Sequence, residues 1–235
     1  MTRRGFEPKD SQWFSAKAVD LLKVARCDIQ WLLDRGYPVG PALELVGGHY
    51  QLTTRQRTAL QRSTATQAQY RHRESTRLAA KDAKDGALLI DGFNLIITLE
   101  VALSGGVLIR GGDGVLRDLA GLHGTYRLIS QTVQALDLVG RALGRLAVPE
   151  ARFYLDAPVS NSGKLKSLIL EQAASWPLPV TVELAANADA VLDKKERIVT
   201  SDSVLLDRCA SWLNLSAMIV RESIPDAWIV CLDSD

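Results

Sequence analysis

The sequence has few cysteines, no long apolar run and almost no net charge. Its three cysteines, Cys27, Cys209 and Cys231, are odd in number and far apart among 235 residues, which argues against a disulfide framework and against a cysteine-rich zinc site. No apolar run reaches the roughly 18 residues that a membrane helix requires. The N-terminal MTRRGFEPKD has no apolar segment behind its basic residues, so we expect no secretory signal. We therefore expect a cytoplasmic protein with no membrane partner.

The formal net charge of +1 conceals two segments of opposite charge. Residues 1–86 contain 15 Lys and Arg against 9 Asp and Glu, whereas residues 87–235 contain 13 against 18. This asymmetry favours a segment that faces nucleic acid, joined to a carboxylate site that binds metal. Two ordinary solvated surfaces are the alternative.

The N-terminal part of the sequence predicts a small module made of helices. Apolar side chains recur at helical spacing in residues 15–35. Thr53 and Gln56 form the pattern of a capping box, which is typical of the start of a helix. The expected segments are a helical module in residues 1–62, a basic linker in residues 63–86 and an α/β domain in residues 87–235.

Between residues 55 and 77 the sequence is polar and basic, with Glu74 as its single acid and with Tyr70 and His72 among the arginines. Guanidinium groups bind phosphate through paired hydrogen bonds, and aromatic rings stack on bases. The stretch therefore predicts a segment that holds an RNA backbone, with a solvated linker as the alternative. The candidate RNA-binding residues are Arg55, Arg57, Arg62, Arg71, Arg73 and Arg77.

From residue 87 onward, short apolar runs alternate with helical patterns. This rhythm predicts a doubly wound, mainly parallel sheet of about five strands with helices on both faces. The glycine-rich residues 104–114 lack the GxGxxG order, so a mobile loop or hairpin is favoured over a nucleotide-binding loop. The expected strands are residues 87–90, 151–155, 179–184, 197–200 and 216–220, with residues 227–232 as an edge element.

Several of the expected strands end on an acid. Asp91, Asp156 and Asp202 follow three of them, and Asp189 lies in a short helix expected at residues 187–192. The carboxyl ends of parallel strands meet at one edge of a sheet. Clustered carboxylates cannot all stay ionised without a cation, and oxygen ligands select hard ions such as Mg²⁺ or Mn²⁺. Simple helix capping by Asp91 and Asn94 is the alternative.

The motifs LLIDGFNLI, FYLDAP and NADAVLDKKERIVTSD, between residues 88 and 202, resemble the PIN-like ribonuclease fold, in particular its NYN-type branch. The similarity extends over roughly residues 87–220. The helical N-terminal part and the segment RGGDGVLRDLAGLHG, residues 110–124, are similar to an uncharacterised prokaryotic family, which implies no activity.

The resemblance implies a metal-dependent ribonuclease with Mg²⁺ or Mn²⁺ bound by Asp91, Asp189 and Asp202. It also implies that Asn94 and Ser201 orient the site and that Asp156 lies at its rim. A further acid is expected from Asp118, with Glu100 and Asp113 as rivals, while Asp193 is expected to be solvated. The alternatives are a catalytically inactive PIN-like module that binds RNA or protein and, third, a phosphohydrolase of small molecules. RNA is the expected partner, and a homo-oligomer is compatible with the sequence.

Overall fold

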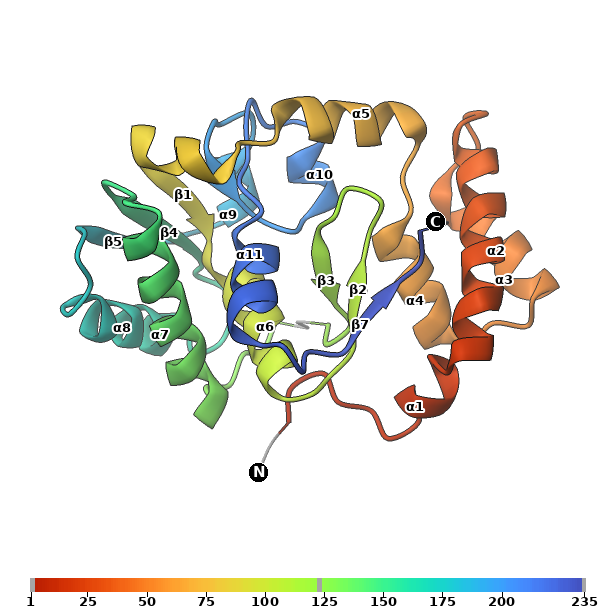
Figure 1. Cartoon of the computed structure of the whole chain (residues 1–235), viewed down its shortest axis with the longest axis horizontal. Helices are drawn as coiled ribbons and strands as arrows, with labels where there is room; N and C mark the ends of the chain where they lie inside the picture. The colour runs from red at the N-terminus through yellow and green to blue at the C-terminus, as the bar shows by residue number, and fades with distance from the viewer. Residues whose placement is uncertain (1–2, 122–123, 234–235) are drawn as a thin grey trace.

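The computed structural model describes residues 3–121 and 124–233, so two residues of the segment RGGDGVLRDLAGLHG, residues 110–124, lie outside the described part. Figure 1 shows an α/β unit at one end of the molecule, the N-terminal helices at the other, and a small sheet between them. Among the described residues, no helix is both long and apolar enough to cross a bilayer.

The larger sheet, here called the main sheet, contains four parallel strands within the described residues, in the order β5-β4-β1-β6. The chain moves outward from β1 to β4 and β5 and then returns to the opposite side of β1 for β6. Strand order therefore reverses between β1 and β6, and such a reversal opens a crevice at the carboxyl ends of the strands. The strands are β1 (Leu88–Asp91), β4 (Ala151–Asp156), β5 (Val180–Ala185) and β6 (Ile198–Val199).

Alternating side chains of β1 and β4 divide the interior of the α/β unit into two clusters. Leu88 and Ile90 of β1 point into the larger core beneath α6, α7, α8 and α11, together with Phe153. Leu89 and Tyr154 point to the opposite face, where they pack against a smaller cluster from α9, α10 and their neighbours. The covering helices are α6 (Gly92–Leu103), α7 (Ser130–Arg145), α8 (Ser162–Ala173), α9 (Ala188–Leu192), α10 (Ser203–Leu206) and α11 (Leu215–Ser223).

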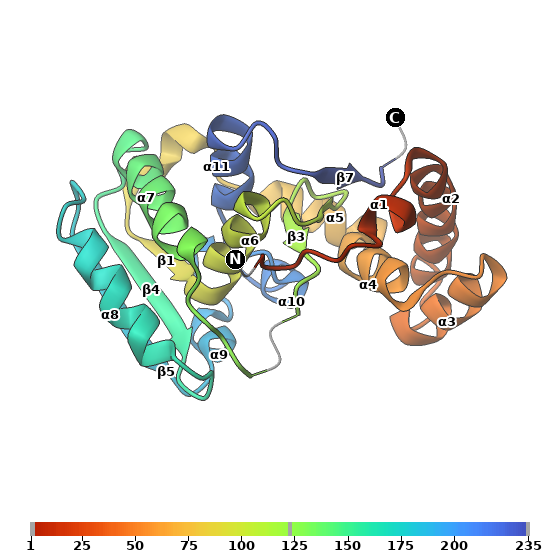
Figure 2. The ribbon, with the colours of Figure 1, turned by 90° about the horizontal axis from the view of Figure 1, so that it is seen from below.

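The helical N-terminal part shares its core with the small sheet. In this sheet β2 pairs antiparallel with β3 and parallel with β7. Val107 and Ile109 point into the apolar core of the N-terminal helices, whereas Leu108 and Leu116 point into the core of the α/β unit. The small sheet is therefore a wall common to both cores. In the view from below, β3 and β7 lie between α6 and α11 on one side and α2 and α4 on the other (Figure 2). Its strands are β2 (Leu108–Arg110), β3 (Leu116–Asp118) and β7 (Ile229–Cys231).

The N-terminal helices follow the expected pattern, with one addition. The capping box of Thr53 and Gln56 is present at the start of α4. Residues 63–86, expected as a linker, contain α5 and a 3₁₀ helix at Ala80–Asp85. A second capping box, formed by Thr66 and Gln69, begins α5. The helices are α1 (Asp10–Trp13), α2 (Ala16–Leu33), α3 (Val39–His49), α4 (Thr54–Ser63) and α5 (Gln67–Thr76).

The C-terminal part differs from the expectation in two respects. Residues 216–220 belong to helix α11 and not to a fifth strand, because Leu215, Ser216, Ile219 and Val220 are buried together at helical spacing. The edge element expected at residues 227–232 does form β7, but β7 joins the small sheet beside β2. The glycine-rich segment forms the β2–β3 hairpin that was expected as one of two forms.

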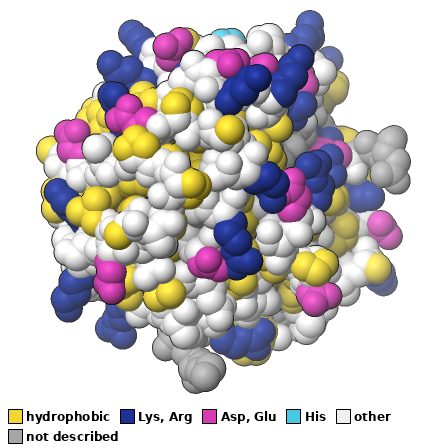
Figure 3. Space-filling model, turned by 60° about the vertical axis from the view of Figure 1, so that its left-hand side comes forward, with side chains coloured by type: hydrophobic (Ala, Val, Ile, Leu, Met, Phe, Trp, Pro, Cys, Tyr) yellow, Lys and Arg dark blue, Asp and Glu magenta, His cyan; other side chains and the backbone are white. Residues whose placement is uncertain are grey.

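Charged side chains on the α/β end of the molecule are mixed in sign. Figure 3 shows Lys and Arg interspersed with Asp and Glu over this face, with apolar side chains between them. The net negative charge of residues 87–235 therefore does not produce an acidic surface on this side.

The shared wall predicts that the helical module and the α/β unit unfold together. Ile109 is fully buried, so Ile109→Ala should lower the free energy of unfolding by about 2–5 kcal/mol. Urea denaturation followed by circular dichroism measures this loss, and we expect a single transition in both proteins. Val133→Ala is the control, because Val133 is 44% exposed and should change stability by less than about 0.5 kcal/mol. Two separate transitions in the wild type would contradict the shared core.

Candidate functional site at the carboxyl edge of the main sheet

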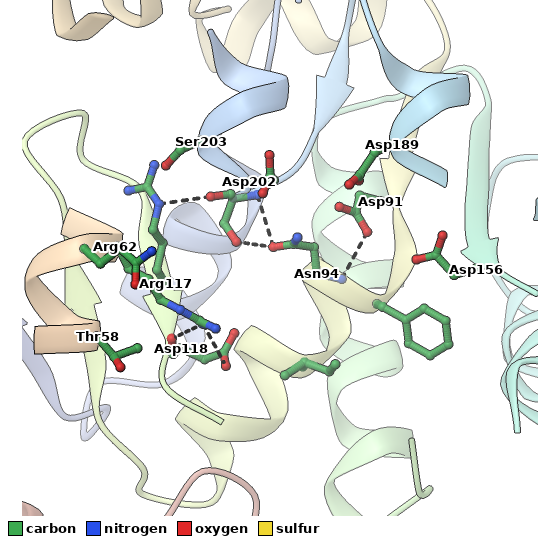
Figure 4. A pocket seen from close by; sticks show the side chains of 14 residues that line it. Thr58, Arg62, Asp91, Asn94, Arg117, Asp118, Asp156, Asp189, Asp202 and Ser203 are labelled. Carbon is green, nitrogen blue, oxygen red and sulfur yellow. Dashed lines mark hydrogen bonds and ion pairs between the residues drawn. The ribbon is translucent and has the colours of Figure 1, made fainter. Parts of the chain in front are cut away.

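A pocket of about 550 Å³ opens where β1 and β6 end, at the reversal of strand order. We call it the strand-edge pocket. In Figure 4, Asp91, Asp156 and Asp189 lie on one side, Thr58, Arg62 and Asp118 lie on the other, and Asn94 and Asp202 lie between them. Its lining residues are Thr58, Gln61, Arg62, Asp91, Phe93, Asn94, Ile97, Arg117, Asp118, Asp156, Asp189, Ser201, Asp202 and Ser203.

Asp91 is the most buried acid of the main sheet's edge. It is the last residue of β1, and α6 begins at once with Gly92, where a Cβ atom would lie 2.6 Å from Leu155 Cδ2. Asp91 Oδ1 accepts from Asn94 N at 3.2 Å, and Oδ2 accepts from the Thr200 hydroxyl at 2.9 Å. Burial, together with the charges of Asp189 and Asp156, raises the pKa of Asp91 to about 7 against the opposing effect of these hydrogen bonds.

Asn94, Thr200 and Ser201 connect the start of α6 to the end of β6. Asn94 Oδ1 accepts from Ser201 N at 3.3 Å and also from the Ser201 hydroxyl. The Thr200 hydroxyl donates to Asp91 and accepts from Asp202 N at 3.1 Å. These bonds fix the backbone of residues 200–202 relative to Asp91.

Asp156 and Asp189 line the pocket on the side of β1 that faces β4, away from β6. Asp156 Oδ1 accepts from Ala188 N, the first residue of α9, at 2.7 Å. Asp189 lies in the first turn of α9, and its carboxylate forms no hydrogen bond or ion pair with the described residues. Partial burial raises the pKa of Asp189, and the charges of Asp202 and Asp156 raise it further. The acids at this edge therefore act on one another electrostatically.

The donor chemistry of the pocket suits a hard divalent cation. Both oxygens of Asp189 and one oxygen each of Asp156 and Asp202 accept no hydrogen bond from the described residues. Carboxylate oxygens are the ligands that Mg²⁺ and Mn²⁺ prefer. As the side chains stand, however, no three His, Cys, Asp or Glu residues in the described ranges are arranged to hold an ion. Binding of an ion at this edge therefore requires the acids to draw together.

The strand-end acids also cap helices, which was the alternative reading of Asp91. Asp91 caps α6 through Asn94 N, and Asp202 caps α10 through Val204 N and Leu205 N at 2.8 and 3.0 Å. Asp156 bonds to the start of α9 in the same way. In Asp156 and Asp202 capping and ion binding are compatible, because the cap occupies one carboxylate oxygen and leaves the other without a partner among the described residues. In Asp91 the second oxygen accepts from the Thr200 hydroxyl.

Of the acids considered as a further ligand, Asp118 is the one that lines the pocket. Asp113 is enclosed by Arg117 and Arg73, whose hydrogen bonds and charges outweigh burial and lower its pKa to about 2. Glu100 is fully buried and accepts from Tyr126 at 2.7 Å. Asp193, expected to be solvated, forms an ion pair with Arg208 at 2.8 Å. Asp113 and Glu100 thus lie outside the pocket that Asp118 lines.

The arginines of residues 55–77 have different surroundings. Arg73 is buried between Asp113 and Asp207, with 2.7 Å to each carboxylate. Arg55 forms an ion pair with buried Asp10, and Arg57 and Arg77 pair with Glu44 and Glu74. Arg71 is exposed on α5. Arg62 is the member of this set that lines the strand-edge pocket.

Sequence reasoning missed four residues that line or support the pocket: Thr200, Arg117, Thr58 and Gln61. Thr200 joins two acids through its hydroxyl, although Thr in the motif VTSD gave no signal beyond β propensity. Arg117 donates from Nε to Ser201 O at 3.0 Å and places the hairpin against the end of β6. Thr58 and its neighbour Gln61 come from α4, and their position depends on long-range packing that the sequence pattern does not contain.

Two family models match the chain. Residues 80–218, more than half of the sequence, match the family described as "Domain of unknown function (DUF5616)". The chain belongs to the DUF5616 family. Residues 21–75 match a second model, "Protein of unknown function (DUF434)", so this DUF5616 member carries the second segment in its N-terminal helices.

A relative of this DUF5616 member is "Uncharacterized protein MJ0935" of Methanocaldococcus jannaschii. It is 31% identical over 185 residues, which cover 79% of this chain and 88% of the relative. No solved structure matches the chain. The descriptions of these two families and of this relative name no activity.

The raised pKa of Asp91 predicts a stability that depends on pH. The pKa of the Asp91 carboxyl is 3.8 in the unfolded chain and is raised to about 7 in the folded protein. The free energy of unfolding therefore falls as the pH rises between these two values. Asp91→Asn removes this loss, since an amide can cap α6 and bond to Thr200. We expect it to be more stable than the wild type by about 2–4 kcal/mol at about pH 8, with an advantage that shrinks toward about pH 4. Urea denaturation between about pH 4 and pH 8 measures the difference in free energy of unfolding between the variant and the wild type. A difference that does not change with pH would contradict the raised pKa of Asp91.

Proposed function

We propose that this DUF5616 member is a metal-dependent ribonuclease whose α/β unit has a PIN-like, NYN-type architecture. The proposal is carried by one observation: Asp91, Asp156, Asp189 and Asp202 face a single pocket at the strand ends, and the last three each keep a carboxylate oxygen without a partner among the described residues. Such a cluster is unfavourable unless a cation joins it. The position at the reversal of strand order is where open α/β sheets bind their ligands.

Asp91, Asp189 and Asp202 are the residues that would hold Mg²⁺ or Mn²⁺ in this proposal. A bound divalent ion would supply activation of water and counter-charge for a phosphodiester. Thr200 and Asn94 keep the backbone of residues 200–202 in register with Asp91. Asp156 and Asp118 complete the acidic rim.

A silent RNA- or protein-binding module is the second candidate, and a specific observation favours it. Asp91, Asp156 and Asp202 each bond to the start of a helix, and no three acidic side chains of the described residues are arranged around an ion. In that case the acids would be caps alone. The two candidates differ in whether the pocket binds a divalent ion.

Titration calorimetry with Mn²⁺ distinguishes these candidates. We expect stoichiometric binding by the wild type, because the ion relieves repulsion among the acids, and loss of that binding in Asp202→Asn. Asp193→Asn is the matched control, since Asp193 lies in the next turn but pairs with Arg208 outside the pocket. Absence of binding by the wild type, with and without an RNA oligonucleotide, would favour the silent module.

Cleavage of RNA in the presence of Mn²⁺ tests the activity itself. Asp91→Asn should lower the cleavage rate by more than about 100-fold, because it removes a charge from the site that would hold the ion. The stability experiment above serves as its folding control, since the variant should be at least as stable as the wild type near neutral pH. Cleavage that is unchanged in Asp91→Asn would show that the activity lies elsewhere or in a contaminant.

A further inference from the structure

One wall of the strand-edge pocket comes from the N-terminal helices. Thr58, Gln61 and Arg62 of α4 line it together with the acids of the main sheet. These residues belong to the segment 21–75 of the second family model, whereas the acids belong to the segment 80–218. The pocket is therefore completed only when both segments are present in one chain.

The position of α4 is fixed by its opposite face. Ala59 and Leu60 are fully buried in the core shared with the small sheet. The capping box at Thr53 fixes the start of the helix. A rigid helix places its outward side chains with little conformational freedom, which favours a binding role for the residues it presents.

Arg62 presents hydrogen-bond donors to the pocket. Its Nη1 donates to the Asp118 carbonyl oxygen and lies 3.4 Å from Asp118 Oδ1. Its Nε and Nη2 groups have no partner among the described residues, and the side chain is 35% exposed. Arg117, the other arginine of the pocket, is instead held by both oxygens of Asp113 and is 5% exposed. Arg62 is thus the arginine of this pocket with donors to offer a ligand.

A phosphodiester that approaches the acids of the main sheet meets negative charge on that side. Donors on the opposite wall compensate for this repulsion, and a guanidinium whose Nε and Nη2 both lack a partner among the described residues matches the geometry of phosphate oxygens. On the basis of the proposed ribonuclease function, we infer that Arg62 binds an RNA phosphate in the strand-edge pocket. The N-terminal helices then supply substrate binding to a site whose acids stand on the α/β unit.

The test measures cleavage of RNA and, in a separate experiment, binding of an oligonucleotide. Arg62→Ala, Arg62→Lys and the wild type are compared for KM and kcat on RNA with Mn²⁺, and by fluorescence anisotropy for binding of a 2′-O-methyl oligoribonucleotide. Arg141→Ala is the matched control, because Arg141 also pairs with an Asp but is 68% exposed on α7, away from the pocket. Thermal unfolding verifies that each variant is folded.

We expect Arg62→Ala to weaken oligonucleotide binding and to raise KM by about 10- to 100-fold, with a smaller effect on kcat. Its binding should also depend less on salt, with a slope of log K against log salt that is smaller by about 1. Arg62→Lys should recover part of the binding, because it keeps the charge but not the paired donors. Arg141→Ala should behave as the wild type.

The outcomes separate this inference from the proposed catalysis. Binding that depends on Arg62 without any cleavage would support the inference and overturn the ribonuclease proposal. Cleavage and binding that are equal in Arg62→Ala and Arg141→Ala would overturn the inference and leave the ribonuclease proposal standing. A wild type that neither binds the oligonucleotide nor cleaves RNA would overturn both.

Discussion

A buried carboxylate between two guanidinium groups holds the walls of the strand-edge pocket in place. Asp113 accepts from Arg117 of the hairpin and from Arg73 of α5, and Arg73 also bonds to Asp207 beside α10. Arg117 in turn donates to the carbonyl of Ser201 at the end of β6. Because charges buried in this way are costly unless they are paired, the hairpin, α5 and the loop before α10 can only take positions that keep the cluster intact.

This cluster also explains why a basic stretch of sequence is a poor guide to a nucleic-acid surface. Arg73 looks like its neighbour Arg71 in the sequence, but its partners Asp113 and Asp207 lie 40 and 134 residues away. Whether an arginine is neutralised inside the fold or offered to a ligand depends on such contacts. Arg62 differs from Arg73 because α4 turns it toward a pocket with acids across from it and a carbonyl beside it.

The strands and helices that the sequence predicts correctly are those whose signal lies within a few neighbouring residues. The features that it does not predict depend on contacts between residues far apart in the chain. The buried runs before Asp91 and Asp156 are strands, and Thr53 and Gln56 begin a helix, because each signal lies within a few residues. The run at 216–220 was ambiguous, since a short apolar segment fits a strand or one face of a helix, and the buried face of α11 settles it. Asp91, Asp156 and Asp202 were found because each follows an apolar run expected as a strand, and Asp189 because it lies in a short helix expected between two of these runs. Thr58 and Gln61 join them only through tertiary packing.

The chemistry of Asp91 goes beyond what a cap requires. Asn caps helices about as well as Asp, and an amide at this position could also bond to Thr200 without carrying a buried charge. The carboxylate, in contrast, is buried near Asp189 and Asp156, and its pKa is raised to about 7, so its ionised form destabilises the fold near neutral pH. A residue that costs stability in its charged form, at the edge where the strand order reverses, is typical of a site that uses the charge. The hydrogen bonds of Asp91 to Asn94 and Thr200 hold its carboxylate at the pocket.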